Sequence, residues 1–163
     1  MAAVDYFLKI DGIPGESNDS KHKGEIEVDS FSWGATNAGS HASGGGGGTG
    51  KVVFQDLHFT THVNKSSPLL MLACASGQHI KKATLYVRKQ GGEQQEYYTL
   101  KLHDVVVTSY QSGGSATGGD SVPTDQFSLS FTTIHYDYKP QKAEGDLDAA
   151  VESGWNVKKN HKA

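Results

Sequence analysis

Apolar and polar residues alternate along much of the chain with a period of two, which is typical of β-strands with one buried face. The first such stretch places Val4, Tyr6, Leu8 and Ile10 on one side of a strand. Further strand-like stretches lie at residues 25–33, 51–63, 83–88, 98–110 and 127–138. The pattern predicts a mainly β fold of about six or seven strands, either a sandwich or a barrel, and we expect a β-barrel of two packed sheets.

In two places the apolar residues of a predicted strand change from one face of the strand to the other. Ile26 lies on one face of its strand, whereas Phe31 and Trp33 lie on the other, so the change falls near Ser30. A second change precedes Ile134. A bulge, a bend, or cover on both faces of the strand would explain each change.

One short helix is predicted at residues 68–76. Ser67 is a candidate N-cap, Pro68 suits the first helical position, and Gly77 suits a left-handed C-terminal position. Residues 69–75 leave almost no polar face, so the helix must be covered by the sheet, by a neighbouring molecule, or by both.

The remaining segments predict turns and loops within a single domain of residues 1–163. Residues 90–93 predict a hairpin turn, and residues 35–50 form a glycine-rich stretch without any large apolar residue. Residues 139–163 read as a C-terminal tail in which residues 154–157 dock as a short strand.

Composition and charge exclude several classes of function. Acidic residues outnumber Lys and Arg by 18 to 15 and Arg88 is the sole arginine, so a nucleic acid is not expected as a partner. Cys74 is the sole cysteine, which excludes an intrachain disulfide. The first apolar run is interrupted by Asp5 and Lys9, so neither a signal peptide nor membrane insertion is expected.

The glycine-rich stretch imitates a nucleotide-binding loop. Residues 45–51 match the glycines and the lysine of a P-loop, but Val52 replaces the Ser or Thr that holds magnesium. A strand is predicted after Lys51, where a P-loop requires a helix. We therefore expect no nucleotide and no other cofactor.

Other candidate chemistry is also weak. His58 and His62 have the spacing of a zinc-binding helix, yet they lie in a predicted strand, where about 13 Å separates such positions. Cys74 lies within an apolar helix, where thiols usually pack as inert groups. We expect no catalytic residue, no metal ligand and no enzymatic activity, although an enzyme with a metal or P-loop remains a third alternative.

Several ordered segments together resemble the Hcp family, the haemolysin-coregulated proteins. The order and spacing of these segments carry the resemblance, which covers essentially the whole chain: residues 11–17 (DGIPGES), 32–34 (SWG), the glycine run into 51–57 (KVVFQDL), 65–68 (KSSP) with its helix, 136–142 (YDYKPQK) and 154–157 (GWNV).

The resemblance implies a structural subunit of the bacterial type VI secretion system. Such a protein is similar to phage tail-tube proteins, forms hexameric rings that stack into the inner tube, and carries or protects small effector proteins in its lumen. Its partners would be other copies of itself and the spike, sheath and baseplate components. It would lie in the bacterial cytoplasm before firing and then be secreted without a signal peptide. Some relatives carry a C-terminal toxin domain, and we expect no toxic activity here, since the chain ends at Ala163.

Two sets of residues are candidates for these roles. Ser32, between Phe31 and Trp33, is a candidate position in the lumen. The glycine-rich loop would contact a neighbouring subunit or ring, although a loop without any role is the alternative. Its candidate contact residues are Ser40, His41, Gly44, Gly45, Gly46, Gly47, Gly48 and Thr49. A monomeric β-sandwich that binds a ligand is the alternative to the whole interpretation.

Overall fold

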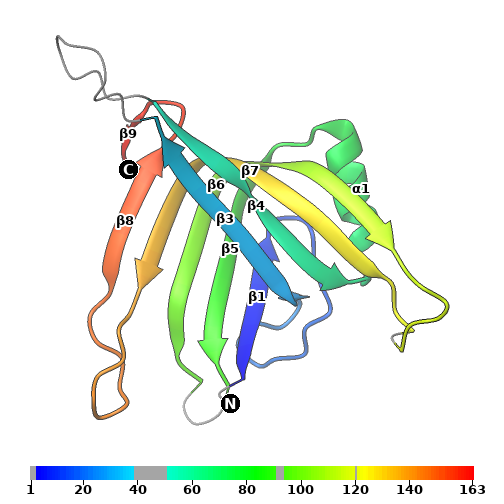
Figure 1. Cartoon of the computed structure of the whole chain (residues 1–163), viewed down its shortest axis with the longest axis horizontal. Helices are drawn as coiled ribbons and strands as arrows, with labels where there is room; N and C mark the ends of the chain where they lie inside the picture. Colours follow the sequence, from blue (N-terminus) through cyan, green and yellow to red (C-terminus); the bar gives the residue numbers. More distant parts are fainter. Residues whose placement is uncertain (1–2, 39–50, 91–93, 120) are drawn as a thin grey trace.

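The computed structural model describes residues 3–38, 51–90, 94–119 and 121–163. Within these residues the fold is mainly β with one short helix, as predicted (Figure 1). The strands are β1 (Val4–Ile10), β2 (Ile26–Val28), β3 (Ser30–Asn37), β4 (Val52–His62), β5 (Ile80–Lys89), β6 (Glu96–Gly113), β7 (Thr124–Tyr138), β8 (Val151–Asn156) and β9 (His161–Lys162), and the helix is α1 (Ser67–Ser76).

The strands form one antiparallel sheet that curls back on itself, in the order β2-β1-β5-β6-β7-β4-β3. β2 and β3 lie at the two ends of this order, although only Asp29 separates them in the chain. The Asp29 N–H donates to the Thr60 carbonyl at 2.8 Å, and the Thr61 hydroxyl donates to the Glu27 carbonyl at 2.7 Å. Among the described strands no ladder joins β2 to β4, so the sheet is not closed by continuous pairing.

The interior is filled by side chains that the alternating pattern placed on one face. Leu8 and Ile10 of β1 are buried, as is Leu100 of β6. Phe59 of β4 and Phe127 of β7 stack with their ring centroids 5.1 Å apart. These residues belong to one continuous core, so the described strands pack as a single unit.

The buried side changes parity in both places that the sequence indicated. Between β2 and β3 the change falls at the exposed Asp29, where pairing passes from β1 to β4. In β7 the buried positions change from the odd-numbered Leu129 to the even-numbered Ile134. The paired strand β6 makes the corresponding change near Asp104, whose φ is 58°. The two paired strands therefore turn together, and Figure 1 shows the change of direction in β7.

Residues 11–25 cover the outer face of β1 and β5. Phe7, which the alternating pattern placed on the polar side of β1, is buried there and stacks on His22 with centroids 4.5 Å apart. Gly15 permits the close approach, because a Cβ at this position would lie 2.5 Å from the Glu25 carbonyl oxygen. Any larger residue would force the backbone of this loop to shift.

An ionic cluster fastens the same loop. Arg88 of β5 is 2% exposed, and its guanidinium donates to Asp19 at 2.6 Å and to Asp5 at 3.1 Å. The hydrogen bond from Arg88 to Asp19 holds the pKa of the Asp19 carboxyl well below its usual range. The loop is thus attached to the barrel by charge as well as by aromatic packing.

The predicted helix is confirmed, but its N-cap is different. The cap is Ser66, and Pro68 occupies the first turn as expected. The Ser67 hydroxyl instead donates to the Asp125 carboxylate of β7, so it ties the helix to the sheet. Gly77 ends the helix with φ 64°, as predicted.

Three loop and tail predictions can be placed in the structure. β5 and β6 pair antiparallel as the hairpin prediction requires, although residues 91–93 of the turn lie outside the described residues. β3 extends to Asn37, three residues into the range expected to be loop. In the tail, the docking strand begins at Val151 and pairs with the second half of β7.

Candidate assembly surfaces

The outer face of β3, β4 and β7 is polar, and Ser32 lies on it. Ser32 is exposed and pairs with His58 of β4, which in turn pairs with Ser128 of β7. Its neighbours Phe31 and Trp33 are half-buried and pack against the core. Ser32 is therefore on the solvent side of the sheet.

Side-chain hydrogen bonds cross this polar face. The Thr108 hydroxyl of β6 donates to Asp56 of β4 at 2.7 Å and lies 2.9 Å from the Ser128 hydroxyl. Ser128 also lies 2.5 Å from the hydroxyl of Ser109. A sheet with one apolar face and one hydrogen-bonded polar face is suited to contact with water or polar cargo.

Helix α1 presents apolar side chains to solvent. Leu70 and Ala73 are buried against the barrel, whereas Leu69, Met71 and Leu72 are 37%, 51% and 57% exposed. Contiguous exposed apolar side chains of this kind, and Met in particular, are typical of contact surfaces between proteins.

Buried polar groups hold the helix in place on the sheet. Asp125 is fully buried and accepts hydrogen bonds from Ser67 and, at 2.8 Å, from the Tyr110 hydroxyl. Burial raises the pKa of Tyr110 above its ordinary value. The phenol therefore stays protonated and able to donate, so the exposed apolar side of α1 is held in a fixed position.

A cavity of about 620 Å³ opens between β3 and β4 on one side and β7, β8 and β9 on the other. It exists because β4 and β8 share one edge of β7: β4 pairs with residues 124–129 and β8 with residues 133–138. Strands β4 and β8 therefore separate from each other where the pairing of β7 passes from one to the other. We call this cavity the aromatic pocket; it is lined by Trp33, Asn37, Val52, Phe54, Ile134, Tyr136, Ser153, Gly154, Trp155, Asn160 and Lys162.

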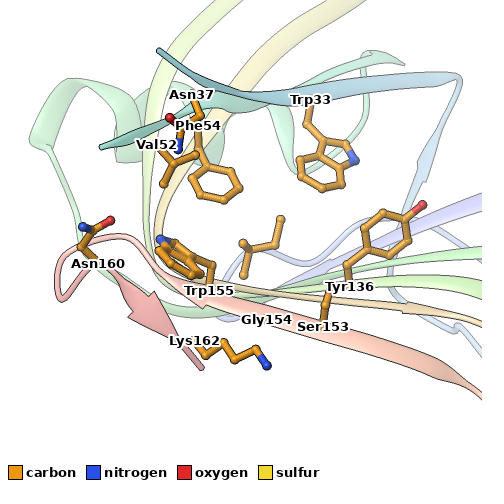
Figure 2. Close-up of a pocket in the computed structure, with 11 residues that line it drawn as sticks. Trp33, Asn37, Val52, Phe54, Tyr136, Ser153, Gly154, Trp155, Asn160 and Lys162 are labelled. Atoms are coloured by element: carbon orange, nitrogen blue, oxygen red, sulfur yellow. The ribbon is translucent and has the colours of Figure 1, made fainter. Parts of the chain in front are cut away.

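Aromatic rings form the facing walls of the aromatic pocket. Figure 2 shows Trp33 and Phe54 opposite Trp155 and Tyr136. The Trp33 indole donates to the Tyr98 hydroxyl at 2.8 Å, and burial raises the pKa of Tyr98 to about 12. The wall at Trp33 is therefore fixed by a neutral phenol over the ordinary pH range.

One polar group of the aromatic pocket has no partner in the part of the chain that the structure describes. The indole N–H of Trp155 is buried and has no hydrogen-bond acceptor among the described residues. Among the described lining residues Lys162 alone is charged, and its ammonium favours a negatively charged neighbour. Sequence reasoning missed this pocket, and its only local signal was the pair of tryptophans on strands far apart in the chain.

The residues considered for enzymatic chemistry do not converge. Lys51 precedes β4, so a strand follows it, as predicted. His58 is exposed on β4, and His62 lies 2.7 Å from Asp29. Cys74 is half-buried and packs against the core. Within the described ranges, no group of three or more His, Cys, Asp or Glu side chains could hold a metal ion.

The eight candidate contact residues of the glycine-rich loop, Ser40, His41, Gly44 to Gly48 and Thr49, lie outside the described residues. Their role stays a prediction. Among the helices that the structure describes, none has the length and apolar character needed to cross a bilayer.

Comparisons with known proteins agree over most of the chain. Residues 7–138 match the family described as "Type VI secretion system effector, Hcp". The chain is 48% identical to "Protein hcp1" of Pseudomonas aeruginosa over 163 residues, covering 99% of each protein.

Solved structures give the same result. One titled "Structure of a type six secretion system protein" matches with a TM-score of 0.91 and 34% identity, covering 99% of this chain and 100% of that one. Hcp1 from Salmonella typhimurium matches with a TM-score of 0.82 and 36% identity, and each chain is covered completely. The chain therefore belongs to the Hcp family of type VI secretion system proteins.

Proposed function

We propose that this protein is a non-catalytic subunit of the type VI inner tube. Copies close into a hexameric ring, rings stack into a tube, and the tube is expelled with small effector proteins in its lumen. The protein is made in the cytoplasm and leaves the cell without a signal peptide. Spike, sheath and baseplate components are its partners in the machine.

The exposed apolar face of α1 is the observation that carries this proposal. Met71 and Leu72 are more than half exposed on a helix that buried hydrogen bonds hold in place. In a chain that matches Hcp proteins along its length, a neighbouring copy is the natural cover for such a face. A ring requires contacts of this kind on every subunit.

The test is the mass of the purified protein in solution. Size-exclusion chromatography with light scattering should give a particle of six subunits, and negative-stain images should show rings with six-fold symmetry. A protein that stays monomeric at high concentration would contradict the ring. It would favour a monomeric β-sandwich that binds a ligand in the aromatic pocket, which is the one observation that supports that alternative.

The lumen role of Ser32 needs a separate test. If the polar face of β3, β4 and β7 lines the lumen, Ser32→Arg should leave the rings intact and reduce co-purification of a small effector several-fold. Thr117→Arg, on an exposed loop residue, is the matched control. Equal effector recovery with both variants would remove Ser32 from the lumen.

A further inference from the structure

The aromatic pocket has the dimensions of a site for a small molecule. Its volume of about 620 Å³ lies within the range of about 300–1,000 Å³ that is usual for such sites. Figure 2 shows Trp33 and Phe54 on one side of the open space and Trp155 and Tyr136 on the other. These four aromatic side chains are half-buried, so each keeps part of its surface exposed to an occupant.

The walls of the aromatic pocket are held in place before any ligand binds. The Trp33 and Tyr136 rings meet edge to face with centroids 5.5 Å apart, and Phe54 meets Phe131 in the same way at 5.7 Å. Trp155 lies on β8, and each of the six residues of β8 is paired with β7. A pre-formed wall lowers the entropy cost of binding, so the pocket is suited to a ligand of few atoms.

The lining selects the kind of body that fits between these walls. A planar aromatic ring can stack on indole and phenyl rings or meet them edge to face, and such pairs add to the free energy of burying apolar area. A sugar ring would also stack on indole, but its hydroxyl groups need several acceptors. No Asp or Glu lies among the described lining residues, so an aromatic body matches the pocket better than a sugar does.

The donors of the aromatic pocket favour an acidic ligand. The Trp155 N–H is buried without an acceptor among the described residues, so a ligand oxygen would satisfy it. Lys162 is the residue of β9 that pairs with Trp155, and it forms no ion pair with any described residue. Residues 157–163 contain two further lysines and no acidic residue. A carboxylate is the group that complements an N–H donor beside a free ammonium.

We propose that the aromatic pocket binds a small aromatic carboxylate of one or two rings. The ligand rings insert between Trp33 and Phe54 on one side and Trp155 and Tyr136 on the other. The ligand carboxylate accepts a hydrogen bond from the Trp155 N–H beside the Lys162 ammonium. This site goes beyond the proposed tube, because every residue that lines it comes from one copy of the chain.

Intrinsic fluorescence tests the site directly, because Trp33 and Trp155 are the two tryptophans of the chain and both line the pocket. The probe is para-nitrobenzoate, an aromatic carboxylate that quenches indole fluorescence on contact. Quenching should be saturable, with half-saturation below about 1 mM. The neutral para-nitrobenzamide should need about a threefold higher concentration, because it lacks the charge. Quenching by both probes that rises linearly without saturation is collisional and would overturn the site.

Two lysines of the C-terminal tail separate local charge from overall charge. Lys162→Gln should weaken the binding of para-nitrobenzoate about threefold and leave the binding of the amide unchanged. Lys158→Gln removes the same charge from an exposed lysine outside the pocket lining, so it should alter neither. Equal effects of the two changes would overturn the placement of the carboxylate at Lys162.

Trp155→Phe keeps a ring in the wall and removes the buried donor. Both probes should then bind about fivefold more weakly, as measured by the fluorescence of Trp33, since each probe offers an oxygen acceptor. Trp33→Phe is the matched control and should weaken binding less, because the Trp33 N–H already donates to Tyr98. Equal losses in the two variants would overturn the hydrogen bond from Trp155 to the ligand.

Binding and assembly are measured separately in these experiments. Light scattering reports the ring, whose absence contradicts the proposed function and leaves the aromatic pocket as a ligand site. Saturable binding to single chains that disappears in assembled rings would show that a neighbouring copy fills the pocket. That result would overturn the assignment of the pocket to a small ligand, whereas binding to both forms supports it.

Discussion

At the scale of single residues, the least expected group is the buried arginine. By alternation Arg88 belongs to the face of β5 opposite the core residues Leu85 and Val87, yet it is 2% exposed beneath residues 11–25. Burial of a guanidinium is stable only when its charge is paired and its donors are satisfied, and Asp19 with Asp5 provides most of that pairing. The Arg88 Nε has no partner among the described residues, and the Phe7 ring, whose centroid lies 4.8 Å from the guanidinium carbon, adds a cation–π contact to the two carboxylates.

Asp19 should make the stability of the protein depend on pH in the acid range. Because the folded pKa of Asp19 lies below the unfolded value near 4, its contribution is complete above about pH 4 and declines as the pH falls further. Asp19→Asn should lower the free energy of unfolding by about 2 kcal/mol at pH 7, and this difference should shrink toward pH 2. Urea unfolding at several pH values measures it.

The matched control is Asp11→Asn. Asp11 is exposed and its side chain makes no hydrogen bond with the described residues, so the change should leave the pH profile of the wild type unaltered. A difference between Asp19→Asn and wild type that stays constant from pH 7 to pH 2 would show that the carboxylate charge is not the cause.

At the scale of elements, the helix shows how one short segment serves two surfaces. α1 has ten residues and no acidic residue in its first turn, so its stability comes mainly from packing rather than from its own sequence. The buried side holds the barrel, and the exposed side is left for a partner. The two sides can be separated by experiment because Leu70 and Leu72 lie two positions apart in the same helix but differ in burial.

Leu70→Ala should lower the free energy of unfolding of the subunit by about 3 kcal/mol, since it leaves a cavity in the core. Leu72→Ala should change that free energy by less than about 0.5 kcal/mol when rings are dissociated, but should weaken ring formation. Denaturant unfolding and light scattering give the two readings. The proposed role of the exposed face is wrong if Leu72→Ala leaves the rings as stable as the wild type.

Elements were predictable where the local pattern determines them. The alternation at Leu8 and Ile10 predicted β1, and Pro68 with Gly77 predicted the bounds of the helix closely. The burial of Phe7 was not predictable, because it depends on a loop that folds over the strand. The aromatic pocket depends on the divergence of two strands that share an edge of β7, and no local pattern encodes that arrangement.

At the scale of the whole molecule, the glycine-rich loop is the largest open prediction. Deleting residues 35–50 would also remove pairing, because Ala35 pairs with Phe54 and Asn37 with Val52. Deletion of residues 40–49 is therefore the correct test, since it leaves residues 38, 39, 50 and 51 as a four-residue connection between β3 and β4.

This shorter chain should fold with a free energy of unfolding within about 1 kcal/mol of the wild type, since loop length has only a weak effect on stability. Stacked tubes, measured by sedimentation and negative-stain images, should be reduced. Replacement of residues 40–49 by ten alternating Gly and Ser residues separates loop length from loop sequence. If tubes grow normally after the deletion, the loop has no role in assembly.

Only Asp29 separates β2 from β3, yet the two strands pair with different parts of the chain. This arrangement sets the order in which the strands can pair as the chain leaves the ribosome. β2 can pair with β1 as soon as both have emerged, and β3 can pair with β4 shortly afterwards. The β3–β4 hairpin then has to wait for residues 124–129 of β7, which are synthesised more than sixty positions after β4 begins. A nascent chain arrested before β7 should therefore hold a protease-sensitive hairpin, and protection should arise in one late step when β7 emerges.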